Sequence, residues 1–377
     1  MLYIPQEQLK TLKKLLLPNK VVVLLGARRC GKTTLVKMFL ETVKQKYLFV
    51  SGEDITVKEY LSCESIEKLK DFIGNNKLLV IDEAQKINNV GLNLKLIVDH
   101  IKGIQIIATG SSSFDLAKNT GEPLTGRKNT LRLFPLSQLE INNIENLAQT
   151  KANLESRLIY GSYPEIIITK SNKERERYLK EIVGSYLYKD VLELDGLKHS
   201  SKLVKILQLL AFQIGKEVSY TELGTQLSMS KNTVERYLDL LEKAFVIYKL
   251  SGFSRNLRKE ITKNVRYNFF DVGIRNALIN NFNPLPMRDD VGMLWENYII
   301  TERMKFMEYK QKNVNCYFWR TYQGQELDLV EERNGKLFGY EIKWSTKNVK
   351  TPTDWKNNYN NSTFKLINRE NYLNFIT

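Results

Sequence analysis

The stretch VVVLLGARRCGKTT, residues 21–34, decides the fold of this chain. Its first five residues are apolar, which favours a buried strand, and the segment from Gly26 to Thr33 fits the pattern G-x-x-x-x-G-K-[ST]. A helical stretch, Thr34–Thr42, follows. Strand, glycine-containing loop and helix in this order predict a phosphate-binding loop, in which backbone N–H groups and the positive end of the helix face the phosphates. The alternative, a chance match in a glycine-containing loop, does not account for the flanking strand and helix.

Each residue of this loop has an expected role in holding ATP and Mg²⁺. Lys32 is placed to reach the β- and γ-phosphates, and the Thr33 hydroxyl is placed to bind Mg²⁺. Arg28 and Arg29 either cap phosphate or pair with acids, and the pattern does not choose between these roles. The predicted nucleotide-binding residues are Gly26, Ala27, Arg28, Arg29, Cys30, Gly31, Lys32, Thr33 and Thr34.

A second apolar segment, Leu78–Ile81, ends in the two carboxylates Asp82 and Glu83. This is the form of a Walker B strand, so Asp82 is expected to hold the Mg²⁺ shell and Glu83 to orient and polarise the attacking water. An acidic pair after a strand can also be a solvated loop. The phosphate-binding loop upstream favours the catalytic interpretation.

Two further positions are candidates for sensing or stabilising the γ-phosphate. Ile104–Ala108 is followed by the hydroxyl-rich run Thr109–Ser113, in which Ser111 is our candidate sensor; an ordinary hydroxyl-rich turn explains the run equally well. Arg127 precedes the last strand of the core, where an arginine in oligomeric ATPases often reaches a neighbour's γ-phosphate. A surface arginine and a phosphate ligand in cis are the alternatives for Arg127.

Composition limits the remaining chemistry. The formal net charge of +15 favours phosphate-rich partners, although a lysine-rich proteome gives the same total. Three scattered cysteines and two histidines argue against a disulfide framework, a zinc site or a histidine-based metal centre. The first twenty residues lack the apolar core of a signal peptide, and no apolar run has the length of a membrane span. We therefore expect a cytoplasmic protein.

Local patterns divide the chain into an α/β part followed by mostly helical and mixed parts. Short apolar strands alternating with helices predict a parallel sheet covered by helices. A helical region follows, and a Pro-containing connector at Asn281–Met287 precedes a final mixed block. The expected strands are Val21–Leu25, Tyr47–Val50, Leu78–Ile81, Ile104–Ala108 and Leu131–Phe134.

The middle of the chain has the pattern of a helix-turn-helix with a wing. Ser219–Glu222 is a capping box before one helix, Ser228–Ser230 makes a short turn, and Lys231–Ala244 is a second amphipathic helix. The apolar strand Phe245–Leu250 follows. Lys231, Asn232, Arg236 and Lys243 lie on the outer face of the second helix and suit a DNA backbone. Winged helices also serve protein packing, so DNA and protein remain alternative partners.

The final block predicts a hairpin that carries carboxylates. Strands around Glu326–Val330 and Tyr340–Trp344 alternate in polarity and flank Asn334-Gly335, a strong hairpin turn. Period-two alternation places Asp328, Glu341 and Lys343 within reach of one another, and the helix around Glu296 offers another carboxylate. This layout suits a phosphodiesterase centre that holds Mg²⁺ or Mn²⁺, and an exposed hairpin with alternating charges is the alternative.

With these residues in place, the chain resembles a bacterial and archaeal group that joins an AAA-superfamily ATPase to a carboxy-terminal domain of unknown function of the restriction-endonuclease-like type. The resemblance implies nucleotide and hydrolysis roles for Lys32, Thr33, Asp82 and Glu83, and a finger-like role for Arg127. It implies a metal centre at Glu296, Asp328, Glu341 and Lys343, although Leu327 stands where the nuclease-like superfamily often has a proline. The matching segments are GARRCGKTT, LLVIDEAQ, ATGSSS, LTGR with LFPLS, GSYPE, FFDVGIRNAL, LWENYI, and ELDLV with GYEIKWS.

The implied architecture is α/β, with an AAA+-type P-loop core (1–145), a helical lid (146–198), a winged helix with connector (199–287) and a restriction-endonuclease-like domain (288–377). We expect an Mg²⁺-dependent ATPase that acts as a switch or motor on nucleic acid, DNA rather than RNA, with a metal-dependent phosphodiesterase centre and a homo-oligomeric assembly as further hypotheses. The alternative is a regulatory ATPase that recruits protein partners and keeps an inactive nuclease-like scaffold.

Overall fold

The computed structural model describes residues 4–111, 124–187, 200–254, 265–347 and 349–377. The chain forms two compact units, one made of Pro5–Pro135 and the other of the first four residues together with Leu136–Thr377. The sequence predicted four regions; this division into two units is coarser and does not test their boundaries, which stay a prediction.

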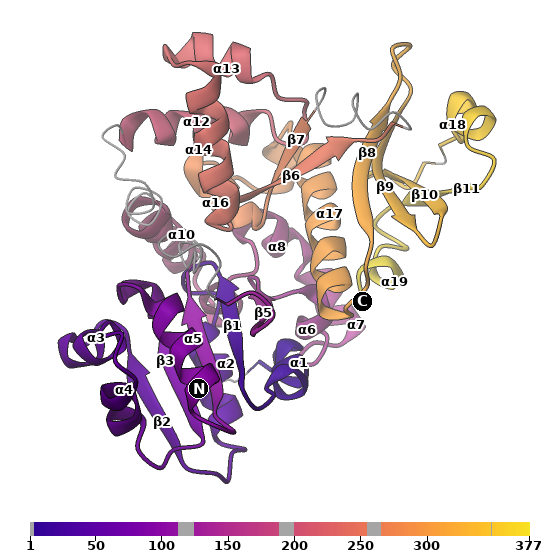
Figure 1. Cartoon of the computed structure of the whole chain (residues 1–377). Coiled ribbons are helices and arrows are strands. Elements are labelled where there is room, and N and C mark those ends of the chain that lie inside the picture. Colours follow the sequence, from indigo (N-terminus) through magenta and orange to yellow (C-terminus); the bar gives the residue numbers. More distant parts are fainter. Residues whose placement is uncertain (1–3, 112–123, 188–199, 255–264, 348) are drawn as a thin grey trace. The chain divides into compact units, whose positions relative to one another are not determined.

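The first unit is a five-stranded sheet with strand order β2-β3-β4-β1-β5, and every pairing in it is parallel. All five strands expected from the sequence are present. They are β1 (Lys20–Gly26), β2 (Tyr47–Ser51), β3 (Leu78–Asp82), β4 (Gln105–Gly110) and β5 (Lys128–Leu133). Figure 1 labels β1, β2, β3 and β5 of this sheet. The helices of this unit are α1 (Gln8–Leu15), α2 (Lys32–Leu40), α3 (Ile55–Leu61), α4 (Ile66–Ile73) and α5 (Val90–His100).

Alternation along the strands divides the core of this unit between the two faces of the sheet. In β1, Val21 and Val23 pack in a cluster with residues of α3, α4 and α5. Val22 and Leu24 point to the other face and pack with residues of α1 and α2. Because both faces are covered, the central strands β1 and β3 are nearly continuous apolar runs, as is usual in parallel sheets.

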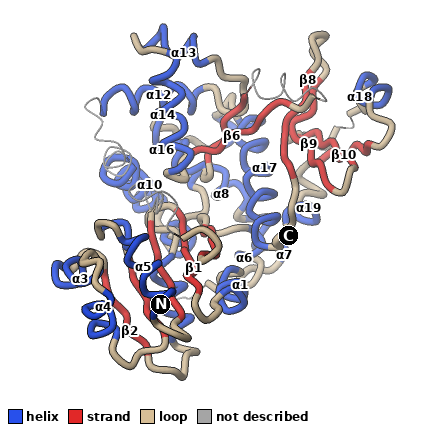
Figure 2. Tube along the Cα trace, in the orientation of Figure 1, coloured by secondary structure: helices blue, strands red, loops and turns tan. Residues whose placement is uncertain are grey.

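The second unit combines helices with a six-stranded mixed sheet of order β11-β10-β9-β8-β6-β7. Figure 2 draws strands in red and labels β6, β8, β9 and β10 of this sheet. Its strands are β6 (Ile247–Gly252), β7 (Val265–Phe269), β8 (Asn315–Arg320), β9 (Glu326–Arg333), β10 (Lys336–Ile342) and β11 (Ser362–Ile367). Its helices are α6 (Gln138–Ile141), α7 (Leu147–Ala152), α8 (Leu154–Tyr160), α9 (Pro164–Ile168), α10 (Asn172–Glu181) with a π-helical turn at Ile182–Leu187, α12 (Ser200–Phe212), α13 (Tyr220–Leu227), α14 (Lys231–Lys243), α16 (Val272–Leu278), α17 (Val291–Tyr309), α18 (Thr353–Asn358) and α19 (Leu373–Ile376).

The helix, turn, helix and strand expected in the middle of the chain are α13, α14 and β6. Ser219 caps α13 by accepting a hydrogen bond from the backbone N–H of Glu222 at 3.3 Å. The strand that follows does not stay within this block. β6 pairs in parallel with β8 through Ser251 and Gly252, so the mid-chain block and the carboxy-terminal block share one sheet.

The hairpin predicted near the carboxyl end is present. β9 and β10 pair antiparallel from Arg333 with Lys336 to Leu329 with Tyr340. The two turn residues, Asn334 and Gly335, have φ values of 50° and 71°, as a two-residue hairpin turn of type I′ demands. None of the described helices combines the length and apolar character needed to cross a lipid bilayer.

Candidate functional site

The phosphate-binding loop connects the end of β1 to the start of α2. Gly31, which precedes α2, has a φ of 102°, a conformation that side chains rarely adopt. At the other end of the loop, a Cβ on Gly26 would lie 2.2 Å from the carbonyl oxygen of Leu133 on the neighbouring strand. Glycine is therefore required at both positions, for conformation at one and for close approach at the other.

Lys32 and Thr33 begin α2 and point their polar atoms into the site. The Lys32 ammonium donates to the carbonyl oxygens of Gly26 (2.9 Å) and Ala27 (3.0 Å), and the side chain is 5% exposed. The Thr33 hydroxyl donates to Oδ2 of Asp82 at 2.8 Å. The loop lysine, the helix-start threonine and the acid at the end of β3 are thus assembled in one place.

Asp82 and Glu83 are held by residues from three segments. The Thr109 hydroxyl, at the end of β4, donates to the other oxygen of Asp82 and accepts from the backbone N–H of Glu83 at 3.1 Å. Glu83 has a φ of 53°, and Gly52 lies so close that an added Cβ would sit 2.4 Å from the Glu83 carbonyl oxygen. These contacts fix the backbone turn that aims the Glu83 carboxylate.

Two glutamines in this site were not predicted from the sequence. Gln85 donates through Nε2 to Oε2 of Glu83 (2.5 Å) and to the hydroxyl of Ser111 (3.2 Å). Gln6 donates to the backbone carbonyl oxygen of Cys30 inside the loop at 3.4 Å. Gln85 follows the acidic pair by two residues, which was the available signal, whereas nothing in the local sequence marks Gln6.

The hydroxyl groups of Ser111 and Thr109 contact different residues of the site. Ser111, our candidate sensor, accepts from Gln85, while Thr109 is the hydroxyl that contacts Asp82. Ser112 and Ser113, the rest of the predicted run, lie outside the described residues. The hydroxyl-rich segment is therefore next to the acidic pair, and Thr109 makes the closest link.

Arg127 lies at the opposite end of the sheet from the phosphate-binding loop. It precedes Lys128, which pairs with Val21 at the start of β1, whereas the loop begins where β1 ends. Its Nε donates to Asp99 at 2.7 Å, and its carbonyl oxygen accepts from the N–H of Val21. At about 3.3 Å per residue the length of β1 separates the two positions, so the alternative of a phosphate ligand in cis is wrong. A role toward a neighbouring copy stays a prediction.

The second candidate site lies where the β9–β10 hairpin opens. The backbone N–H of Ile342 donates to Oδ2 of Asp328 at 2.7 Å. Lys343 Nζ lies 2.6 Å from Oε1 of Glu341 and 3.7 Å from Oδ2 of Asp328. Asp328 and Glu341 are 2% and 7% exposed, and Lys343 is more open to solvent. The structure therefore brings together the two carboxylates and the lysine singled out in the sequence.

Glu296 of α17 adds to the negative charge of this cluster. Burial, together with the charge of Asp328, raises the pKa of Glu296 well above its usual range. Burial and Asp328 also raise the pKa of Glu341 to about 7. Burial raises the pKa of Asp328, although Lys343 opposes this. Carboxylates packed in this way bind a proton or a cation more readily than isolated ones.

Arg266 of β7 is a second cation at this cluster that the sequence did not reveal. Its guanidinium lies 3.7 Å from Glu296 and 3.0 Å from Glu326, and it stacks 4.3 Å from the centre of the Phe318 ring. It is 5% exposed. Its acidic partners lie about thirty and sixty residues away in the chain, so no local pattern could have identified it.

The number of possible ligands limits how this cluster could bind a metal ion. Within the described residues no three His, Cys, Asp or Glu side chains come together in a way that could hold a metal ion. The predicted extension of the ligand set to Glu296 is therefore not seen. Oε2 of Glu341 is buried and has no hydrogen-bond partner among the described groups, so Asp328 and Glu341 remain as the pair of carboxylates that could meet a cation.

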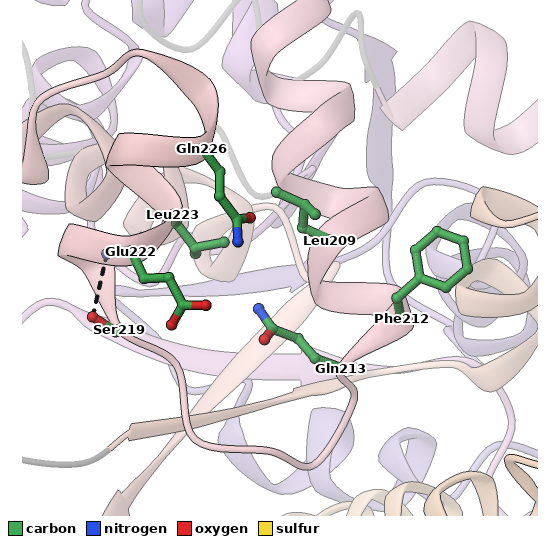
Figure 3. Close-up of a pocket in the computed structure, with 7 residues that line it drawn as sticks. All are labelled: Leu209, Phe212, Gln213, Ser219, Glu222, Leu223 and Gln226. Carbon is green, nitrogen blue, oxygen red and sulfur yellow. Dashed lines mark hydrogen bonds between the residues drawn. The ribbon is translucent and has the colours of Figure 1, made fainter.

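A separate hollow of about 170 Å³ lies between α12 and α13 (Figure 3). It contains no residue of the phosphate-binding loop or of the carboxylate cluster, and we assign it no part in either chemistry. The side chains that line it are Leu209, Phe212, Gln213, Ser219, Glu222, Leu223 and Gln226.

Comparison with protein families divides the chain into three parts. Residues 18–142 match the AAA domain family, 151–285 match a domain of unknown function (DUF8612), and 291–369 match another domain of unknown function (DUF4143). The first match, the five-stranded parallel sheet and the loop geometry agree. Residues 18–142 are therefore similar in sequence to the AAA domain family, and they have the parallel sheet and the loop of a P-loop fold.

Similar full-length proteins come from bacteria and archaea. An uncharacterized protein of Mycobacterium tuberculosis is 26% identical over 326 residues, covering 86% of this chain and 70% of that protein. An uncharacterized protein of Methanocaldococcus jannaschii is 26% identical over 365 residues, covering 89% and 80%. One of Haemophilus influenzae is 23% identical over 372 residues, covering 90% and 87%.

Among solved structures, the chain is similar to one protein from Pyrococcus horikoshii. That protein is a signal transduction ATPase with numerous domains (STAND), and it has a tetratricopeptide repeat sensor. The sequences are 12% identical, and the match covers 81% of this chain and 47% of the other. The TM-score of 0.24 is too low to support an argument about either fold or function.

Proposed function

We propose that the first unit binds MgATP and hydrolyses it, and that hydrolysis times an action of the second unit on nucleic acid. The observation that carries the ATPase proposal is the hydrogen bond from Thr33 to Asp82. A hydroxyl and a carboxylate joined across β3 and α2 are the two protein oxygens from which a P-loop site holds Mg²⁺.

The residues of the loop fit the nucleotide. Backbone N–H groups between Gly26 and Lys32 would bind the phosphates, and Lys32, which now contacts two loop carbonyls, would contact phosphate oxygens instead. Thr33 and Asp82 would hold Mg²⁺, which would supply positive charge to neutralise the charge that develops on the phosphates. Glu83 orients the attacking water and accepts its proton. Gln85 and Thr109 are the groups that keep Glu83 aimed at that water.

Steady-state phosphate release tests this proposal. Wild type, Lys32→Ala and Glu83→Gln are compared with Glu370→Gln, which removes an exposed carboxylate of the other unit. We expect Lys32→Ala to lose nucleotide binding, and Glu83→Gln to bind nucleotide but to hydrolyse it at least about 100-fold more slowly, because a positioned base typically contributes about 10²–10⁴-fold. Hydrolysis by Glu83→Gln at the wild-type rate would contradict the assignment.

We further propose a metal-dependent phosphodiesterase centre in the second unit. It rests on Asp328 and Glu341, which are buried, adjacent and in contact with Lys343. Mg²⁺ and Mn²⁺ are commonly bound by one or two carboxylates together with waters, so this pair fits such an ion. Oε2 of Glu341, which has no hydrogen-bond partner among the described groups, is the oxygen that we expect to bind the ion.

Each group at this centre has a chemical task. Asp328 and Glu341 would hold the ion, which would supply a bound water of lowered pKa and a positive charge for the scissile phosphate. Lys343 is more exposed than either acid and positions the water or neutralises charge that develops on the phosphate. Glu296 and Arg266 set the field around the ion, because Arg266 offsets part of the negative charge of Glu296.

Cleavage of plasmid and single-stranded DNA with Mg²⁺ or Mn²⁺, with and without ATP, tests the centre. Wild type is compared with Asp328→Asn and Lys343→Ala, and with Glu370→Gln as the control. We expect both site variants to lose cleavage while ATP hydrolysis continues. If wild type cuts nothing while it hydrolyses ATP, the chain is better described as a regulatory ATPase that recruits protein partners through an inactive nuclease-like scaffold.

Nucleic acid is the proposed partner of α14. The helix exposes Lys231 and Arg236, within a chain whose net charge is +15. Each lysine or arginine that neutralises a DNA phosphate contributes about one unit to the slope of log affinity against log salt. We expect Lys231→Ala with Arg236→Ala to reduce that slope by about two. The matched pair Lys10→Ala with Lys13→Ala on α1 should leave it unchanged, and equal effects would rule out α14 as the contact.

A further inference from the structure

The chain passes between its two units at two places, Ile4–Pro5 and Pro135–Leu136. On the side of the first unit, a residue close to each passage, Gln6 or Leu133, contacts the phosphate-binding loop. Gln6 donates to the carbonyl oxygen of Cys30, and the Cys30 thiol donates to the carbonyl oxygen of Leu133 at 3.6 Å. Cys30 is fully buried. A shift of the loop therefore acts on both passages.

These contacts leave the loop little free space. A Cβ on Gly31 would lie 2.7 Å from Nε2 of Gln6, and one on Gly26 would lie 2.2 Å from the carbonyl oxygen of Leu133. Closely packed atoms transmit displacement instead of absorbing it. A change in the position of the loop backbone should therefore displace the chain at both passages.

On the side of the second unit, both passages join one buried cluster. Ile4, Leu136 and Ile141 pack together, with exposures of 8%, 1% and 0%. The segment that follows β5 is also bonded to α17. Lys305 Nζ donates to the carbonyl oxygen of Leu136 at 3.3 Å, and the N–H of Gln138 donates to Oε2 of Glu302 at 2.6 Å.

Glu302 and Lys305 are themselves an ion pair, at 2.8 Å, and are 2% and 1% exposed. Burying two charges costs more than an apolar pair of the same size, so such a pair is poorly explained by stability alone. Here both members also bond the backbone of the passage. Their hydrogen bonds specify where Leu136 and Gln138 attach to α17.

α17 carries Glu296, six residues before Glu302, or about 9 Å along the helix axis. The same helix contacts the strands of the carboxylate cluster. Asn297 exchanges hydrogen bonds with both backbone groups of Phe269 on β7, and Arg303 pairs with Glu331 on β9 at 2.6 Å. A displacement of α17 therefore either moves Glu296 relative to β7 and β9 or moves both strands together with the helix.

We infer that Glu302 and Lys305 are positioning residues that convey the nucleotide state of the phosphate-binding loop, through the Leu136–Gln138 segment, to α17 and its Glu296. The inference rests on the proposed nucleotide binding, and it does not require that the second unit cut nucleic acid. The coupling is reciprocal, so whatever binds the carboxylate cluster alters nucleotide affinity by the same factor.

Hydrogen–deuterium exchange of the full-length chain tests the coupling without any cleavage assay. Exchange in peptides from α17, residues 291–309, is measured with no nucleotide, with ADP and with a non-hydrolysable ATP analogue, and nucleotide binding is titrated in the same samples. In wild type we expect the ATP analogue to slow exchange in α17 about fivefold or more, the lower end of typical coupling between sites. In Glu302→Gln with Lys305→Met, which removes both charges, this difference should disappear while nucleotide binding persists.

A second buried pair serves as the matched control. Arg157 and Glu145 form an ion pair in the same unit, 2% and 13% exposed, and neither bonds the Leu136–Gln138 segment. Glu145→Gln with Arg157→Met removes two comparable charges and should keep the nucleotide-dependent difference in α17. If the Glu302 and Lys305 double variant does not fold, Gln6→Ala provides the test from the other passage, and it should reduce the difference without removing it.

Two results would overturn the inference. One is wild-type exchange in α17 that is the same with and without bound nucleotide; the other is a double variant that responds as wild type does. Either leaves the ATPase and cleavage proposals intact, because these are measured separately. Absence of nucleotide binding in wild type would overturn this inference and the proposed ATPase together.

Discussion

Replacing Thr109 by valine removes one hydroxyl from the nucleotide site and leaves the size of the side chain almost unchanged. Thr109 is fully buried. Its hydroxyl donates to Asp82 and accepts from the backbone N–H of Glu83. In the valine variant the Asp82 carboxylate and the Glu83 N–H both lose this partner. Because the position is buried, a water molecule cannot easily take the place of the hydroxyl.

The size of the effect follows from these two bonds. A buried polar group left unsatisfied costs about 1–3 kcal/mol. If that cost falls on the conformation in which Glu83 faces the attacking water, the barrier to hydrolysis rises by a similar amount. Since about 1.4 kcal/mol corresponds to a factor of ten, kcat should fall roughly 5- to 150-fold. Nucleotide affinity should change little, because Lys32 and the loop backbone are untouched.

The assay measures phosphate release at saturating ATP and the dissociation constant of a fluorescent nucleotide. Thr109→Ser is the control, because it keeps the hydroxyl and loses only a methyl group. Hydrolysis by Thr109→Val at the wild-type rate would refute the reasoning that Thr109 holds Glu83. An equal loss in both variants would point to packing instead of hydrogen bonding.

Three further predictions concern other parts of the chain. Gly26→Ala should abolish nucleotide binding in titrations and lower the unfolding free energy by about 1–3 kcal/mol, because its Cβ would meet the Leu133 carbonyl; unchanged binding would contradict the close approach. Trp355→Ala should cost about 3–5 kcal/mol in chemical denaturation, whereas Tyr322→Ala, at 98% exposure, should cost under about 0.5 kcal/mol; similar losses would refute the assignment of Trp355 to the core. Burial, with Glu331 nearby, raises the pKa of the half-buried Cys316 to about 12, so at pH 8 it stays a thiol and iodoacetamide should label it much more slowly in the native protein than after denaturation; equal labelling rates, detected by mass spectrometry of its peptide, would argue against the raised pKa.

The first unit could be predicted from its sequence because its central strands β1 and β3 are nearly continuous apolar runs and the loop motif follows the first of them. The roles of Lys32, Thr33 and Asp82 depend on positions within two short segments, and the structure brings those segments together. Arg127 shows a limit of reasoning from motif order. The strand that follows it is parallel to β1, so a residue before that strand lies at the amino end of the sheet, far from the loop.

The second unit was harder to predict because its important contacts join distant segments. The β9–β10 hairpin was identifiable, since its turn chemistry and polarity are local. The pairing of β6 with β8, the contact of Arg266 with Glu296, and the bond of Lys305 to Leu136 each join positions more than twenty-five residues apart. Patterns within a short window contain no information about such partners.

The sheet shared by β6, β7 and β8 also bears on how this protein can evolve and be dissected. A chain cut in the connector at Asn281–Met287 leaves β6 and β7 on one fragment and β8 on the other, and each fragment then exposes unpaired backbone along a strand. Exposed edges of this kind recruit other strands and promote aggregation. The mid-chain helices and the carboxy-terminal strands are therefore expected to be inherited together through gene fusion and recombination. Soluble fragments should be obtained only by dividing the chain outside this sheet.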